Sequence, residues 1–509
     1  GVNVANVDGT AEASVTDSAV YSVSDVTVNA NENREVTSFN GNTAAGFGAV
    51  GANVSVVTVG QEIDEASYQA SYDWKDENGA TQTTTVKAKD DAGAEISAAY
   101  DKAQNVIRDG ELLSTQAFGY AGIPAKQDIT LSRGGQASAV TAAMENSSVL
   151  SGGNIKVASA EHTDVKIEQY GFGAGVASVN GTVAVLDTNR NAATKVDGSS
   201  LTAYGNIDVT SDVSGTAGAS AIQGTAGAAA ALNGAFAFSD AANSSHLEIV
   251  GSNLGAYHMA HLAAKDSSQT ELDAISVAGA GAGAIGVQVA EATTKSAAEG
   301  VDILINNSTI AALGTDAKYR PLDENGNIGD KDAIPITSWD HAVTIEAENT
   351  QTMKTNLTTV DAALAGAASV AVSEVKAGGV EKDDDTNKLK PSVTVKGNST
   401  LKSEADEKNA IYVGAKADIA QEASMTAVDV ALVGAVSVNY DGADTNSDVS
   451  VSLGENTRYD AGNGALIAKG ETNLSQKLDA EGVDVSVSTI SVGVGNNAVN
   501  ANNTLQTTV

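Results

Sequence analysis

The sequence repeats itself at a spacing of 53 residues, and this repeat constrains the fold more than any other feature. The segment GSSLTAY at 198–204 recurs as GSNLGAY at 251–257, and NGTVAV at 180–185 recurs as NGAFAF at 233–238. Such a period is typical of arrays in which each unit is one supersecondary structure that stacks on the next. A chain of 509 residues is also too long for a single compact core of the usual size. We therefore expect a repeat array.

Two landmarks extend the repeat to about seven units. The first is an alternating apolar pair after a Gly/Ala-rich segment, as at Val183 and Val185, and the second is an alternating pair in a short segment, as at Ile155 and Val157. The first landmark recurs at Val54/Val56, Phe236/Phe238, Val287/Val289, Val370/Val372, Val436/Val438 and Val492/Val494. The second recurs at Val26/Val28, Ile207/Val209, Val343/Ile345 and Ile411/Val413, with looser copies near Met259 and Leu466.

Alternation of apolar and polar residues inside the units, as in NIDVTSD and VTIEAEN, predicts β-strands. The uncharged run Val213–Ser239 contains GTAGAAAALNGAFAF, whose Ala content favours a helix and whose length would suit a membrane span. The run also contains Ser, Thr, Gln, Asn and many Gly, and its aligned copies alternate and carry charges. We therefore predict strands here, since tertiary context overrides a weak helix propensity.

Strand units with short turns and no intervening helices predict an all-β fold, a β-solenoid with two or three coils per unit. With strands about 4.8 Å apart, the array would form a rod on the order of 70–100 Å long. The pattern predicts that Val183, Val185, Phe236 and Phe238 point into the core. It also predicts close backbone approach at Gly175, Gly181, Gly227 and Gly234.

Extra residues interrupt the repeat near 61–136, 314–340 and 379–391, and all four Pro residues fall there. The absence of Pro from the units fits strands that are hydrogen-bonded throughout. The first insertion predicts a β-hairpin around Asn78-Gly79 and then a short amphipathic helix ending near Gly110.

Aromatic residues in the insertions are the candidate partner-binding residues, because loops on a rigid scaffold often carry binding. Alternatively, they only pin the insertions onto the scaffold. The candidates are Tyr72, Trp74, Tyr319 and Trp339.

Composition and motifs exclude several functions. A net charge of −35 argues against nucleic acid, and the lack of Cys excludes disulfides and thiolate chemistry. The acidic stretch 323–327 lacks the spacing of a calcium loop, and His258 and His261 lack that of a zinc enzyme. The acidic run 383–385 could attract calcium, but such a run of charges is usually solvated. We predict no catalytic residues, metal or cofactor, because no catalytic motif is present.

The segments GFGAGVASVNGTVAV (171–185) and NRNAATKVDGSSLTAYGNIDVTSD (189–212), with their copies, resemble the large leukotoxin-type filamentous adhesins related to filamentous haemagglutinin. The resemblance covers nearly all of the chain outside the insertions, and the long first insertion departs from it. It implies a right-handed parallel β-helix at the cell surface or secreted, exported by an outer-membrane transporter. It also implies adhesion to a receptor or glycan on a host or neighbouring cell, and no enzymatic activity.

We further expect this chain to be a segment of a longer polypeptide, because it opens GVNVANVDGT without Met or a basic leader. Copies of the chain are expected to associate end to end or laterally into fibres, because stacked strands expose unpaired edges. Two other functions stay open: a membrane-damaging, leukotoxin-like toxin that uses the Gly/Ala-rich strands, and a polysaccharide-active enzyme.

Overall fold

The computed structural model describes residues 2–60, 63–75, 81–90, 126–133, 139–313, 318–319, 334–335, 342–378, 388–404, 410–486 and 490–508. These residues form an all-β structure without helices, and its main sheets are parallel. The repeating element is a layer, best seen in β10 (Ile155–Asp197). A first arm (155–175) leads into a bend, a second arm (177–197) returns, and the short strand β11 (Ser200–Ala203) closes the layer.

Seven layers have both arms. The arms are β4 (Val26–Val59) with β8 (Val140–Glu145), β10, β12 (Ile207–Val250), β14 (Ala260–Ala280) with β15 (Gly283–Asn306), β19 (Val343–Ala363) with β20 (Gly366–Ala377) and β21 (Pro391–Lys396), β23 (Ile411–Ala431) with β24 (Gly434–Leu453), and β26 (Leu466–Ser486) with β27 (Ile490–Thr508). The short strands are β3 (Ala19–Ser22), β9 (Ser148–Ser151), β11, β13 (Asn253–Ala256), β16 (Thr309–Ala312), β22 (Thr400–Ser403) and β25 (Arg458–Asp460). β1 (Val2–Val7) and β2 (Ala11–Thr16) continue the stack as part of a second arm.

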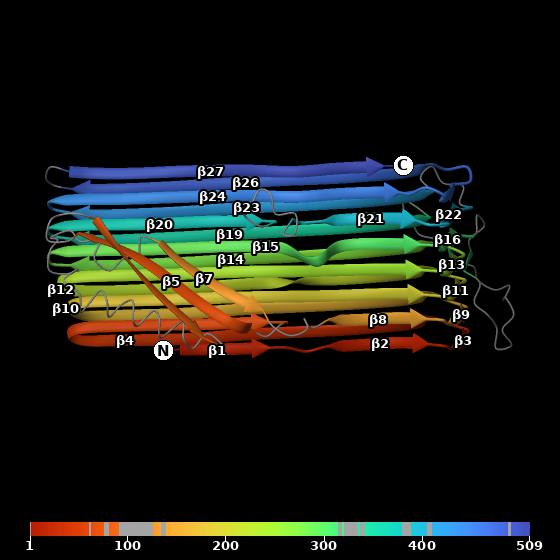
Figure 1. Ribbon diagram of the computed structural model, residues 1–509, viewed down its shortest axis with the longest axis horizontal. Helices are drawn as coiled ribbons and strands as arrows, with labels where there is room; N and C mark the ends of the chain where they lie inside the picture. The colour runs from red at the N-terminus through yellow and green to blue at the C-terminus, as the bar shows by residue number, and fades with distance from the viewer. Residues whose placement is uncertain are drawn as a thin grey trace.

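Each layer is hydrogen-bonded in parallel register to the next, in chain order from β1 to β27 (Figure 1). Ile155 pairs with Val26 on one side and Ile207 on the other, and Ile207 pairs with Ala260. The second sequence landmark therefore forms one column through all seven layers, including the loose copies at Ala260 and Leu466.

One unit of the repeat makes one layer, so the expectation of two or three coils per unit is wrong. No strand lies between Ile155 and its neighbour Ile207. The long dimension therefore follows the strands: an arm of about 20 residues spans roughly 70 Å, and seven layers stack to roughly 30 Å. A sequence period gives the offset between stacked copies but not the number of turns that the chain makes within it.

The first landmark drifts in register along the stack. Val183 pairs with Val54 and Phe236, but Phe236 pairs with Val289 and not with Val287. From β15 onward the predicted equivalents lie two and then four residues early. An even shift leaves a side chain on the same face of the strand, so the alternating pattern survives the drift.

The hydrophobic core lies between the two arms and contains the residues next to the predicted ones. Ala184 and Leu186 belong to the main core cluster, as do Ala235 and Ala237 of the next layer. The inward assignment of Val183, Val185, Phe236 and Phe238 is therefore wrong. Most of these outward side chains are nevertheless buried. Figure 1 shows β5 (Ile63–Lys75) and β7 (Lys126–Arg133) passing across the stack obliquely.

The turn after each second arm repeats one conformation. Gly198 and Gly251 have φ of 57° and 58°, and Asn146, Asn307 and Asn456 have similar positive values. Gly and Asn tolerate this left-handed conformation, which explains the GSS, NSS and NST signals.

A buried serine follows this turn in five layers and forms a ladder. The Ser199 Oγ accepts a hydrogen bond from the Ser147 backbone N–H at 3.0 Å, and the Ser252 Oγ accepts from Ser199 at 3.0 Å. Ser308 and Ser399 extend the ladder with bonds of 3.1 and 3.2 Å. These side chains satisfy backbone groups that the ladder leaves unpaired at the turn.

The insertions add short antiparallel strands. In the first insertion β5 pairs with β6 (Thr81–Asp90) and with β7. The Asn78-Gly79 turn and the predicted helix lie outside the described residues. In the second insertion β17 (Lys318–Tyr319) pairs with β18 (Ile334–Pro335).

Pro391 corrects the expectation that Pro is absent from the stacked strands. It is the first residue of β21 and pairs with Val301. The first position of a strand tolerates a residue without an N–H.

Two bend glycines make a matched test of close backbone approach. A Cβ on Gly227 would lie 1.9 Å from the Ala230 carbonyl oxygen, whereas a Cβ on Gly279 of the next layer would meet nothing within 4 Å. We expect Gly227→Ala to lower the unfolding free energy by about 2 kcal/mol or more, since a backbone clash must be relieved. Gly279→Ala should change it by less than about 0.5 kcal/mol. Denaturant unfolding of both variants measures this, and equal stabilities would contradict the bend geometry.

Candidate functional site

The predicted aromatic residues lie on two separate insertion sheets. Tyr72 and Trp74 are two positions apart on β5 and pair with Thr84 and Gln82 of β6. Tyr319 pairs with Ile334 in the two-stranded sheet of the second insertion. Trp339 lies outside the described residues. No strand pairing joins these two sheets within the described parts of the chain.

The first insertion enters the second arm at a defined point. Val59 and Val140 pair with Thr188 and Ala192, so residues 60–139 stand where β10 has only residues 189–191. In the N-terminal part of the stack, Asp8, Gly9 and Thr10 fill the same gap between β1 and β2.

The third insertion enters at the same column of the stack. Thr188 is linked in register through Ala241 and Thr294 to Ala377, after which residues 378–390 interrupt the arm. Hence two of the three insertions emerge from one line across the second arms. We call this line the insertion column.

A buried ionic network lies between the arms beside the insertion column. Glu32 and Glu161 are register neighbours in successive layers, which places two like charges side by side. Arg34 bridges them: its Nη1 donates to Glu161 Oε1 at 2.5 Å and its Nε donates to Glu32 Oε1 at 2.8 Å. The Glu161 Oε2 accepts a hydrogen bond from the Asn191 backbone N–H at 2.7 Å, which ties the network to the opposite arm.

The network continues through Arg190 into the next layers. The Arg190 Nη1 donates to Ser268 Oγ at 3.0 Å, and the Ser268 Oγ donates to Asp266 Oδ1 at 2.6 Å. The Asp266 carboxylate also accepts from Asn243 Nδ2 at 3.1 Å and from Gln351 Nε2 at 2.7 Å. Arg190 is 1% exposed, and its Nε and Nη2 have no hydrogen-bond partner among the described residues.

Burial controls the protonation of this network. It raises the pKa of Glu161 to about 7, although Arg34 and Arg190 favour the ionised form. It raises the pKa of Asp266 to about 6 against the hydrogen bonds from Ser268, Asn243 and Gln351. Burial also lowers the pKa of Arg190, and Asp266 opposes that effect.

A second set of buried carboxyl groups lies near the bends. Asp361 and Asp429 are register neighbours, and each is 0% exposed. Burial and then the neighbouring Asp429 raise the pKa of Asp361 well above its ordinary value. Burial likewise raises the pKa of Asp441 to about 7. The Asp429 Oδ2 accepts a hydrogen bond from Ser369 Oγ of the opposite arm at 2.7 Å.

These groups join the layers and arms but form no open reaction centre. The carboxyl groups lie inside the stack, where a polymeric substrate cannot reach them. Among the described residues, no three His, Asp or Glu side chains are placed to hold a metal ion. An alignment of the repeat units could have revealed the ionic network, because polar pairs recur at the same two positions. These pairs are Glu32/Arg34, Asp266/Ser268 and Asn349/Gln351.

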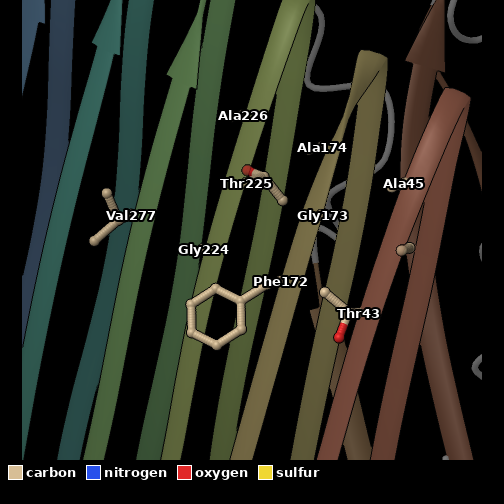
Figure 2. Close-up of a pocket in the computed structure, with 10 residues that line it drawn as sticks. Thr43, Ala45, Phe172, Gly173, Ala174, Gly224, Thr225, Ala226 and Val277 are labelled. Carbon is tan, nitrogen blue, oxygen red and sulfur yellow. The ribbon is translucent and has the colours of Figure 1, made fainter.

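An apolar groove of about 300 Å³ lies on the outward face of the first arms, close to the bends. Figure 2 shows Phe172 of β10 beside Gly224 of β12, with Thr43 of β4 and Val277 of β14 on either side. These four residues form one register column in which Gly224 contributes no side chain. Phe172 is 49% exposed, and its ring lies 3.0 Å from where a Cβ on Gly224 would be.

No family model matches the chain, and no curated protein or solved structure matches it significantly. The described residues include no helix with the length and hydropathy of a membrane span.

The buried carboxyl groups predict a stability that falls as pH rises. For Glu161, Asp266 and Asp441 the folded-state pKa exceeds the ordinary value, so the folded state holds protons that the unfolded state releases. Their contribution should therefore be present at about pH 4 and be lost by about pH 7. Thermal unfolding measured across this range should show the decline.

Asp361→Asn isolates one of these groups. The amide stays neutral in both states, so the variant should unfold at a higher temperature than the parent at pH 8 and at nearly the same temperature at pH 4. The matched control is Asp448→Asn, on the outward face of β24. Equal gains from both substitutions at pH 8 would refute the assigned burial of an ionisable carboxyl.

Proposed function

We propose that this chain is a structural segment of a filamentous adhesin, built as a right-handed parallel β-helix. The in-register stacking of seven layers supports this proposal most directly, because each layer presents the same hydrogen-bonding edge as the one before. Right-handedness follows the strong preference of parallel strands for right-handed connections. The serine ladder and the ionic network join successive layers, so the stack resists shear between them.

We place the protein at the outer cell surface or in the extracellular space, with an outer-membrane transporter as its export partner. The sequence resemblance supports both proposals. The net charge of −35 suits a solvated extracellular particle and opposes nonspecific clumping. Copies of the chain would assemble through strand edges, which pair over short distances that salt affects little.

We assign adhesion to the first insertion. It emerges from the insertion column, and its strand β5 contains Tyr72 and Trp74. Its partner would be a receptor or glycan on a host or neighbouring cell, since aromatic side chains are common binding residues. We propose no enzymatic activity, because the carboxyl groups that the fold brings together are buried.

Replacing residues 60–139 by Asp-Gly-Thr tests this assignment. The same three residues, 8–10, already connect β1 to β2 at the equivalent position, so the stack should fold and unfold cooperatively as before. Binding of the fluorescently labelled protein to cultured epithelial cells and to immobilised glycans should fall at least about tenfold.

The double variant Tyr72→Ala/Trp74→Ala is the matched control that keeps the hairpin backbone. It should lose most of the binding if these two aromatic residues make the contact. Unchanged cell and glycan binding by the Asp-Gly-Thr replacement, with the fold intact, would rule out adhesion through this insertion.

A further inference from the structure

The bends of successive layers together form an uncharged edge of the molecule. We call this the bend edge and define it as residues 44–50, 174–179, 226–232, 279–285, 362–368 and 430–436, none of which is charged. Its exposed side chains are large for such a Gly/Ala-rich region: Phe47 is 85% exposed and Leu364 is 59% exposed. Leu432 and Val433 extend the exposed apolar ridge.

Both outward faces next to the bend edge are also apolar. On the second arms one register column consists entirely of Val50, Val179, Leu232, Ile285, Ala368, Val436 and Val492. On the first arms another column consists of Thr43, Phe172, Gly224, Val277, Val360 and Val428. The ridge and its two flanks thus form an apolar wedge, which includes the groove of Figure 2.

The interior of the wedge combines two small Ala clusters, Ala231/Ala278/Ala284 and Ala367/Ala431/Ala435, with many buried polar side chains, unlike the usual apolar core of a water-soluble protein. The Gln169 side chain donates to the Val183 carbonyl of the opposite arm at 2.8 Å, and Gln288 donates to the Thr358 carbonyl at 2.6 Å. Other buried polar residues at this level are Ser178, Asn180, Thr182, Gln223, Asn233, Ser276, Thr359, Asp361, Ser369, Asp429, Ser437 and Asn439. An apolar exterior over a partly polar interior is stable where the surroundings are apolar.

In three successive layers the backbone of the bends is hydrogen-bonded from one layer to the next, as entry into lipid requires. The Gly281 N–H donates to the Gly227 carbonyl at 3.1 Å, and the Ala282 N–H donates to the Ala229 carbonyl at 2.9 Å. The Gly366 N–H continues the series to Ala282 at 3.0 Å. An unpaired backbone group costs several kcal/mol in hydrocarbon, so a bend hydrogen-bonded between layers can be buried there at little cost.

We propose that the bend edge inserts into one leaflet of a zwitterionic lipid bilayer. Outward-facing charged residues limit how deeply the bend edge can enter the bilayer. Asp273 precedes the bend of its layer and Glu291 follows it, and the outward residues between them are uncharged. The uncharged strand from Ile275 to Gly281 is about 20 Å long, and the hydrocarbon layer of one leaflet is roughly 15 Å thick. The negative net charge excludes anionic lipid as the preferred surface.

Shape favours lipid over a second copy of the chain. The bends lie together along one edge of the stack (Figure 1), with an apolar column on each flank, and a fluid bilayer can surround such an edge on all sides. A second copy would bring its own bend edge and a further net charge of −35. Two such ridges would leave their flanks exposed.

The test is flotation of the 509-residue chain with vesicles of pure phosphatidylcholine. The parent should float with the vesicles. The variant Phe47→Asp/Leu364→Asp/Leu432→Asp should lose at least about tenfold of the bound fraction, since each buried apolar side chain contributes more than a tenfold step in affinity. The control Tyr21→Asp/Val23→Asp changes equally exposed residues at the far end of the layers and should bind like the parent.

Because the chain has no Cys, a single introduced thiol can report depth. An environment-sensitive dye at Phe47→Cys should shift to the blue with vesicles, and the same dye at Tyr21→Cys should not. Release of vesicle contents would overturn the one-leaflet depth. Absence of parent binding, equal binding of the Asp variant, or edge-dependent dimers without flotation would overturn the proposal itself.

Discussion

Parallel hydrogen bonding between copies of one unit is the constraint on which the rest of this structure depends. It places each residue beside its equivalent in the next layer, 52 or 53 positions away between β10, β12 and β14, so every choice of side chain is repeated as a column across the stack. Apolar columns such as that of Ile155 need no special arrangement, because apolar side chains in successive layers pack against one another. Turn columns repeat as well, which is why the left-handed conformation recurs at Gly198 and Gly251.

A column that repeats a charged residue brings like charges together, and the interior accommodates such charges in two ways. Glu32 and Glu161 are neighbours of like charge, and Arg34 from the next inward position bridges them. Asp361 and Asp429 are also register neighbours, and burial together with the neighbouring Asp429 carboxyl raises the pKa of Asp361. The first arrangement joins layers by ion pairs, and in both arrangements the buried carboxyl groups make stability depend on pH.

Two regions of the stack depart from the simple pattern of apolar interior and polar exterior. At the insertion column the arm is interrupted and the interior is ionic. At the bend edge amide side chains lie inside, and Phe47 and Leu364 lie outside. Both regions carry our functional proposals, adhesion for the first and lipid contact for the second. They lie at different positions along the layer, so one molecule could use both at once.

The sequence by itself determined the strands, the repeat and its insertions. Alternation, the 53-residue offset and the GSS and NSS turns are local or periodic signals, and the column of Ile155 and Ile207 follows from them directly. Only the tertiary structure decided the number of layers per unit and which alternating face is the core. Val183 and Ala184 are both apolar and adjacent, and only the position of the opposite arm shows that Ala184 lies inside. The ionic network and the apolar wedge also depend on that position, because each is defined by which side chains two distant segments enclose between them.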